Sequence, residues 1–269
     1  MEEKLHDLRT ILSHLGPTLV AFSGGVDSSF LLAVAAEVLR DQVMALMTIS
    51  SSTPPEDAEQ ARMLAGVLNV RLLIIPHDEL AMPEYAANPT NRCYFCKNSL
   101  YDICQREAQR LSLRSIADGV NLDDLSDYRP GIQAAAEYNI VHPLVEARFS
   151  KADIRTASRS LGLPTWEKPA SPCLSSRVPY GTPITARMLS QIARAESFIR
   201  AQGFQELRVR HHGTTARIEI RTDDFAHLSV ATIQAMQHEL KESGFLSCAL
   251  DMEGYRSGVF NEGLRIKDK

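Results

Sequence analysis

The chain has 269 residues, of which 44% are hydrophobic and 23% charged, and its formal net charge is −4. This composition is typical of a globular protein with a large core, and it excludes disorder and argues against a nucleic-acid partner. The charged start Met1-Glu-Glu-Lys leads into an amphipathic helical pattern, so we expect no signal peptide, no membrane partner and a cytoplasmic location.

The first motif lies between the apolar run Leu19–Phe22 and the apolar helical pattern Phe30–Leu39. A helix that begins after a glycine-rich turn presents unpaired backbone N–H groups, and the glycines let the backbone approach an anion. No lysine follows the glycines, so the pattern of kinase-type ATP loops is absent. The sequence predicts a phosphate loop of another kind, with a simple glycine-rich turn as the alternative. Its residues are Ser23, Gly24, Gly25, Asp27, Ser28 and Ser29.

Strand and helix patterns then alternate through the first half of the chain. This alternation predicts an α/β domain with a parallel sheet, covered on both faces, whose ligands bind at the carboxyl ends of the strands. An acidic loop follows the last predicted strand, and Asn121, Asp123, Asp124, Asp127 and Arg129 should lie near that edge unless the loop is only a solvated turn. The predicted strands are 19–22, 43–49, 70–75 and 115–118, and the predicted helices are 5–15, 28–40, 55–68, 96–110, 131–138 and 154–161.

A change of composition marks the expected domain boundary. Residues 164–183 contain five prolines and the only tryptophan, so this stretch is too rigid for a helix. We therefore predict a first domain over 1–165, a Pro-rich segment over 166–183 that carries active-site residues, and a small α+β domain over 184–269 for substrate binding and oligomerisation. The elements expected there are helices over 185–201 and 229–243 and strands over 207–211, 216–221 and 246–252.

Five cysteines and no export signal make a disulfide framework improbable. Cys104 and Cys248 fall on apolar faces and are expected in the core, whereas Cys93, Cys96 and Cys173 sit among turn and charged residues. Lys168 and Arg177 flank Cys173 in sequence, and nearby cations lower the pKa of a thiol, which favours a nucleophile. A structural cysteine between prolines is the alternative reading.

Three segments together resemble one known family. They are the Ser-Gly-Gly-x-Asp-Ser loop, the stretch Leu122-Asp-Asp-Leu-Ser-Asp-Tyr-Arg-Pro-Gly131 and the stretch Pro169-Ala-Ser-Pro-Cys-Leu-Ser-Ser-Arg177. Over nearly the whole chain the sequence is similar to the LarE family, the sacrificial sulfur insertases of nickel-pincer nucleotide biosynthesis, within the PP-loop ATP pyrophosphatase superfamily. The resemblance implies an adenine nucleotide alpha hydrolase-like first domain that uses ATP, with Asp27 helping to hold Mg²⁺.

The resemblance also implies a reaction. A carboxylate of a nicotinate-derived mononucleotide is adenylated, pyrophosphate leaves from the loop, and Cys173 supplies sulfur with Arg177 in the same catalytic segment. Paired guanidiniums suit a phosphate group, so Arg208 and Arg210, with Glu196 nearby, are the expected substrate-phosphate residues. A solvated strand edge is the alternative reading for the two arginines. Family members form oligomers, and we expect a homo-oligomer.

The pair Cys93 and Cys96 departs from the single-cysteine members of that family. Two thiolates three residues apart can hold one metal centre, and with Cys173 they match a family branch thought to carry a 4Fe–4S cluster. A zinc site and a redox pair are the alternatives. At the level of the whole protein, the competing hypotheses are a PP-loop tRNA thiolase, an amidating ligase related to NAD synthetase, and a non-catalytic metal carrier.

Overall fold

The computed structural model describes residues 1–126 and 130–256. The chain divides by its contacts into two compact units, and each is described by itself. The first comprises Met1–Glu79 and Asn91–Ser171, and the second comprises Leu80–Thr90 and Pro172–Lys269. The division between Ser171 and Pro172 falls inside the Pro-rich segment, but the sequence did not indicate that residues 80–90 leave the first unit.

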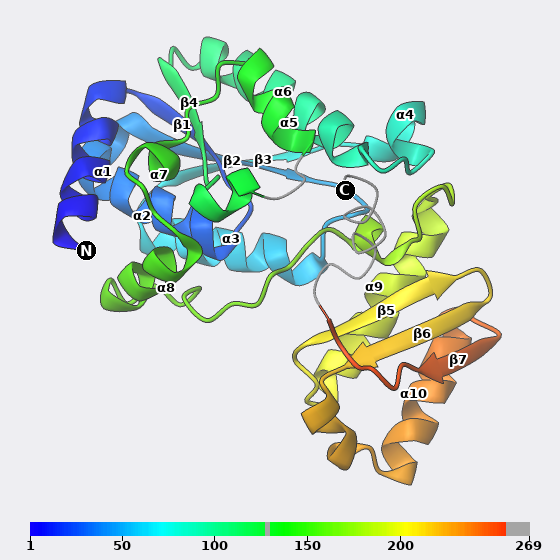
Figure 1. Cartoon of the computed structure of the whole chain (residues 1–269). Coiled ribbons are helices and arrows are strands. Elements are labelled where there is room, and N and C mark those ends of the chain that lie inside the picture. The colour runs from blue at the N-terminus through cyan, green and yellow to red at the C-terminus, as the bar shows by residue number, and fades with distance from the viewer. Residues whose placement is uncertain (127–129, 257–269) are drawn as a thin grey trace. The chain divides into compact units, whose positions relative to one another are not determined.

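The first unit is built on a four-stranded parallel sheet with the strand order β3-β2-β1-β4 (Figure 1). The register pairs Ala21, at the end of β1, with Asp118 at the end of β4 and with Leu46 of β2. The carboxyl ends of all four strands therefore share one edge, where ligands bind in sheets of this kind. The strands are β1 (Thr18–Ala21), β2 (Val43–Ile49), β3 (Arg71–Pro76) and β4 (Ser115–Asp118).

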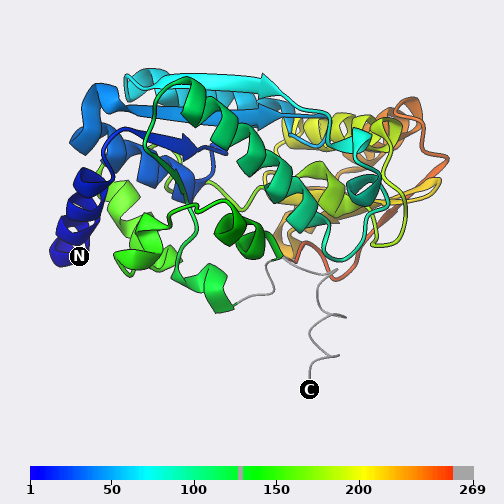
Figure 2. The same cartoon turned by 90° about the horizontal axis from the view of Figure 1, so that it is seen from above.

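Helices cover both faces of this sheet because alternate strand residues face opposite cores. Val20, Ala45 and Ala117 belong to a core with α1, α2, α3, α7 and α8, whereas Leu19 and Leu46 belong to one with α5 and α6. Figure 2, seen from above, shows α5 running along its face of the sheet. The helices are α1 (Glu2–Leu15), α2 (Val26–Leu39), α3 (Pro55–Val67), α5 (Arg92–Arg110), α6 (Pro130–Glu137), α7 (Pro143–Glu146) and α8 (Lys151–Ser160).

The second unit has a three-stranded sheet of order β5-β6-β7, in which β5 and β6 are antiparallel and β6 and β7 parallel. Its core lies between this sheet and helices α9 and α10, and it contains Val209, Ile218 and Leu240. The predicted fold class, a parallel-sheet domain followed by a small α+β domain, is confirmed. The elements of this unit include α4 (Pro83–Ala86), η4 (Leu174–Arg177), α9 (Ala186–Ala201), β5 (Leu207–His212), β6 (Thr215–Ile220), η5 (Thr222–His227), α10 (Val230–Glu242) and β7 (Ser247–Leu250).

Two local features differ from the sequence prediction. Helix α5 begins at Arg92 rather than at Cys96. Cys93 and Cys96 therefore both lie within the helix, near its start, and not in an irregular loop. The segment before it, for which no helix or strand was predicted, contains the short helix α4, which begins with a proline at its first position, where the missing N–H costs nothing. In the part of the chain that the structure describes, no helix is long and apolar enough to cross a membrane.

Candidate active site

The phosphate loop joins β1 to α2 as predicted from the sequence. Gly24 has a φ of 69°, which favours glycine, and Gly25 caps α2 without any side-chain hydrogen bond to the first turn. The first backbone N–H groups of α2 are thus available to an anion. The hydroxyl oxygens of Ser23 and Ser28 lie 3.0 Å apart beside the loop, whereas Ser29 is completely buried.

Asp27 lies in the first turn of α2, and its two carboxylate oxygens have different surroundings. Oδ2 accepts a hydrogen bond from Lys151 Nζ at 2.5 Å, while Oδ1 is buried and has no hydrogen-bond partner among the described residues. A buried carboxylate oxygen without a donor suits a hard cation such as Mg²⁺. Lys151, which begins α8, supplies the loop with the positive charge that the local sequence lacks, and no local pattern could have revealed it.

The loop after β4 packs directly against the start of α2. A Cβ atom on Gly119 would lie 2.7 Å from the backbone nitrogen of Ser28, so only glycine fits this approach. Beyond it, the N–H of Asn121 donates to Asp124, and Asp123 accepts from the N–H of Lys151 at 2.6 Å. The acidic loop is therefore tied to α8, near Asp27. The expected Asp127 and Arg129 lie outside the described residues.

An ion pair between the half-buried Lys168 and the buried Asp57 holds the start of the Pro-rich segment beside the phosphate loop. Lys168 Nζ donates to Asp57 Oδ1 at 2.8 Å and to the carbonyl oxygen of Gly24 at 3.1 Å, and Ser171 Oγ donates to Asp57 Oδ2 at 3.1 Å. The ammonium that the sequence placed beside Cys173 is thus engaged by Asp57, at the start of α3. Asp57 was not singled out in the sequence.

The carboxyl edge of the sheet carries a second polar group that the sequence analysis missed. Asp118, at the end of β4, accepts from Tyr101 Oη at 2.6 Å and lies 2.7 Å from His142 Nδ1. Burial, the largest single influence, raises the pKa of Asp118, but the hydrogen bonds from His142 and Tyr101 and the charges of Lys97 and His142 together outweigh it and lower this pKa below its usual value. The carboxylate therefore fixes the orientation of the His142 ring.

Cys93 and Cys96 lie one helical turn apart on α5. Cys93 is exposed, and the Cys96 thiol donates to Glu79 Oε1 at 2.8 Å. The other oxygen of Glu79 accepts from Ser50 and Ser52, so this carboxylate is held firmly in place. Among the described residues, no three His, Cys, Asp or Glu side chains gather as a metal site requires. Two thiols can ligate a metal. Cys93 and Cys96 belong to the first unit and Cys173 to the second, so the three-cysteine set stays a prediction.

Cys104 is the buried cysteine of α5. It is completely covered in the core, and burial raises the pKa of its thiol to about 12. It therefore stays protonated at neutral pH and takes no part in nucleophilic or metal chemistry.

Cys173 is half-buried and stands just before the short helix η4 in the second unit. The guanidinium of Arg177 donates to the carbonyl oxygens of Pro172 and Cys173 at 2.6 and 3.0 Å, and to both carboxylate oxygens of Glu196 at 2.8 and 2.7 Å. Arg177 and Glu196 are 1% and 2% exposed. Burial alone would lower the pKa of Arg177, but Glu196 raises it, so both groups remain charged. Arg177 therefore shapes the backbone around Cys173.

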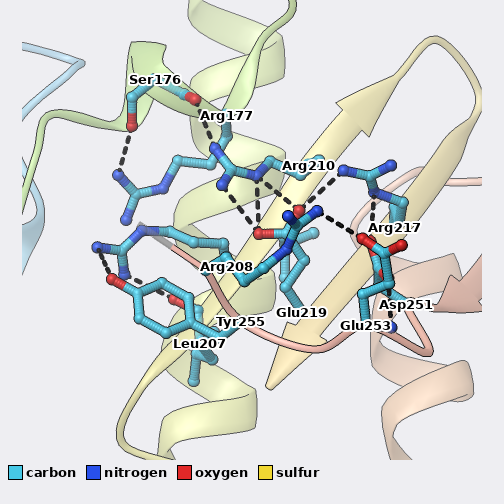
Figure 3. Close-up of polar contacts among 12 residues, drawn as sticks. Ser176, Arg177, Leu207, Arg208, Arg210, Arg217, Glu219, Asp251, Glu253 and Tyr255 are labelled. Carbon is cyan, nitrogen blue, oxygen red and sulfur yellow. Dashed lines mark hydrogen bonds and ion pairs between the residues drawn. The ribbon is translucent and has the colours of Figure 1, made fainter. Parts of the chain in front are cut away.

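Arg208 and Arg210 project beside this segment from β5, and both are buried (Figure 3). Arg210 donates to Glu219 and to the carbonyl oxygen of Ser176, and Arg208 stacks on the ring of Tyr255. Burial and the neighbouring charge of Arg177 lower the pKa of Arg208 to about 10. The arginines are thus not on a solvated strand edge.

Comparison with known proteins agrees with this geometry. The family model for NAD synthase matches residues 9–90, which include β1, the phosphate loop and α2. The parallel sheet, the loop and this match define a PP-loop domain of the kind that uses ATP.

Relatives that match nearly the whole chain show to which family of PP-loop proteins it belongs. An uncharacterised Synechocystis sp. protein, slr1717, is 43% identical over 98% of this chain and 99% of its own. The pyridinium-3,5-bisthiocarboxylic acid mononucleotide synthase of Lactiplantibacillus plantarum is 35% identical over 94% of this chain and 92% of its own. An uncharacterised protein of Methanocaldococcus jannaschii is 28% identical over 89% and 90%. The chain belongs to the LarE family of PP-loop ATP-dependent sulfur transferases.

Proposed function

We propose that this protein converts a carboxylate of a pyridinium dicarboxylate mononucleotide into a thiocarboxylate at the expense of ATP. The relative from Lactiplantibacillus plantarum carries the name of such a synthase. The observation in this chain that supports the proposal best is the uncapped first turn of α2 together with the unpartnered Oδ1 of Asp27. Backbone donors for a pyrophosphate and a carboxylate for its Mg²⁺ thus lie in one turn of helix.

In the first proposed step, a carboxylate oxygen of the substrate attacks the α-phosphorus of ATP. The bond from this phosphorus to the bridging oxygen breaks, and pyrophosphate remains on the phosphate loop. Asp27 would hold Mg²⁺, which neutralises the phosphate charge when bound. Lys151 keeps Asp27 oriented and adds a positive charge beside the loop.

In the second step, the thiolate of Cys173 attacks the acyl carbon, and AMP leaves with the electron pair of the C–O bond. Removal of the proton on Cα of Cys173 then breaks the Cβ–S bond. The sulfur stays on the substrate as a thiocarboxylate, and the residue becomes dehydroalanine. Arg177 contributes by holding the carbonyl oxygens around Cys173 in place.

The phosphate of the mononucleotide is proposed to bind near Arg208 and Arg210, with Glu196 keeping the neighbouring Arg177 in position. The buried guanidiniums of Arg177, Arg208 and Arg210 converge in the second unit, together with the two buried carboxylates of Glu196 and Glu219. Phosphate oxygens are natural acceptors for guanidinium donors. Binding requires that the phosphate take over hydrogen bonds that Arg208 and Arg210 now make inside the protein.

The decisive experiment is the intact mass of anaerobically purified protein before and after one turnover with ATP, Mg²⁺ and the carboxylated nucleotide, with iron measured on the same sample. We expect the peptide that contains Cys173 to lose about one H₂S, and Cys173→Ala to abolish sulfur transfer. An unchanged mass, about four irons per chain and several products per protein would instead identify a cluster held by Cys93, Cys96 and Cys173 as the source.

A further inference from the structure

The stretch Thr165–Ser171 forms no helix or strand, yet several side chains hold it in the first unit. Arg155 of α8 donates to the carbonyl oxygens of Trp166 and Lys168 at 2.7 and 2.9 Å. The two carboxylate oxygens of Asp57 accept hydrogen bonds from Lys168 and Ser171. Its own backbone adds a turn, in which the N–H of Lys168 donates to the carbonyl oxygen of Thr165 at 3.0 Å. This irregular stretch is therefore fixed both by that turn and by side-chain partners.

The residues that follow Cys173 are fixed to other elements. Ser175 Oγ lies 2.6 Å from Tyr85 Oη, and the carbonyl oxygen of Ser176 accepts from Arg210. The boundary between the two units falls between Ser171 and Pro172. Cys173 is therefore the second residue after the last contact with Asp57, at the point where the chain passes from one set of partners to the other.

The link from Asp57 reaches the phosphate loop through a single peptide group. Lys168 donates to the carbonyl oxygen of Gly24, and the N–H of the same peptide group belongs to Gly25. Among the residues that the structure describes, this N–H makes only a long contact of 3.4 Å with Ser23 Oγ. An anion that accepts from the N–H of Gly25 polarises the peptide group and strengthens the bond from Lys168 to its carbonyl oxygen.

We propose that Asp57 is a positioning residue for Cys173 and that nucleotide on the phosphate loop tightens its hold. Asp57 fixes Lys168 and Ser171, and these fix the start of the segment that carries the sulfur. This inference rests on the proposed function, in which the thiolate of Cys173 must meet an acyl adenylate formed beside the loop. It assigns Asp57 to the sulfur step and not to adenylation.

The test compares the protein with Asp57→Asn, which keeps the shape of the side chain but removes the charge that holds Lys168. The first measurement is the rate at which iodoacetamide alkylates Cys173, with and without Mg²⁺ and a non-hydrolysable ATP analogue. We expect the analogue to slow alkylation of the unchanged protein at least about threefold and to have no effect on the variant. If the analogue slows both proteins equally, it shields the thiol directly, and the proposal is wrong.

The second measurement separates the two chemical steps. Asp57→Asn should slow thiocarboxylate formation about 10- to 100-fold, the size of effect expected when a reacting group is misplaced by about 1 Å. Exchange of pyrophosphate into ATP, which reports adenylation, should stay within about twofold. Asp57→Glu should restore part of the sulfur step. An equal loss in both steps, together with a lower melting temperature, would show a merely structural role.

Lys4→Met is the matched control because it breaks a more exposed ion pair, with Asp153, in the same unit. It should change neither the alkylation response nor the ratio of the two steps. The two proposals can fail separately. Absence of pyrophosphate exchange in the unchanged protein would refute the proposed function, whereas the alkylation measurement reads the link from the loop to Cys173 without any turnover.

Discussion

The phosphate loop and the arginine cluster of the second unit (Arg177, Arg208, Arg210 and Arg217) are both proposed to meet phosphate groups, but they are built differently. The loop offers backbone N–H groups without a side-chain cap, set by Gly24 and Gly25. The arginines instead make extensive contacts with carboxylates, carbonyl oxygens and an aromatic ring (Figure 3). A backbone site is thus prepared by local geometry, whereas a side-chain site depends on partners from distant parts of the chain.

The largest effect should come from the ion pair that supports this cluster. Glu196→Ala leaves the guanidinium of Arg177 buried without a counter-charge and removes the acceptor for the N–H of Val209. Loss of one partner of a buried pair costs about 3–5 kcal/mol. Urea unfolding measures this free energy.

Glu239→Ala is the control for that prediction. It breaks an ion pair between Glu239 of α10 and Arg194, which lies on the exposed side of α9, the helix that also carries Glu196. It should cost at most about 1 kcal/mol. Equal losses for the two variants would mean that the buried pair contributes no more than a surface pair.

A smaller effect, on activity alone, is expected at the phosphate loop. Asp27→Asn removes the charge proposed to hold Mg²⁺ and should lower pyrophosphate exchange about 100-fold, which is about 2.7 kcal/mol of transition-state stabilisation. The free energy of unfolding should change little. Glu37→Gln on the exposed face of α2 should leave exchange as it is, and an unaltered Mg²⁺ dependence of Asp27→Asn would exclude the assigned role.

The packing of the two loops predicts a third effect. Gly119→Ala would put a methyl group 2.7 Å from the backbone nitrogen of Ser28, and overpacking of this kind costs about 1–3 kcal/mol. Gly66→Ala, in helix α3 with open space around it, should instead stabilise the protein by about 0.5–1 kcal/mol. Thermal unfolding and nucleotide binding of both variants give the comparison, and a destabilised Gly66→Ala would contradict it.

The smallest effect is expected far from both regions. The hydrogen bond from Lys4, with those of Ser150, lowers the pKa of Asp153 to about 2. A lowered carboxyl pKa stabilises the folded state above the unfolded pKa of about 3.9, and this contribution is lost as the pH falls through 2. Lys4→Met should therefore cost less than about 1 kcal/mol at pH 7, and this cost should shrink as the pH falls toward 2. A cost at pH 2 as large as that at pH 7 would contradict this linkage.

The sequence predicted what depends on neighbouring residues. The order of strands and helices around the phosphate loop follows from apolar periodicity and from two adjacent glycines, and it is confirmed. The partners of Asp27 and Asp57 could not be predicted in this way, because Lys151 and Lys168 lie more than a hundred positions along the chain. Arg208 and Arg210 share a strand face at period two, but their burial depends on Ser176, Glu219 and Tyr255, which no local pattern connects.

The detour of residues 80–90 into the second unit has a consequence for how this protein is made. Tyr85 and Asn88 contact residues 175–182, which are about ninety positions later in the chain. During synthesis these two side chains leave the ribosome long before their partners exist. We expect the small unit to complete its structure only after the first unit has been translated, and a fragment that starts at Pro172 to lack part of its own interior. The second unit is therefore built from two separate stretches of the chain, and it cannot be moved to another protein as one continuous segment.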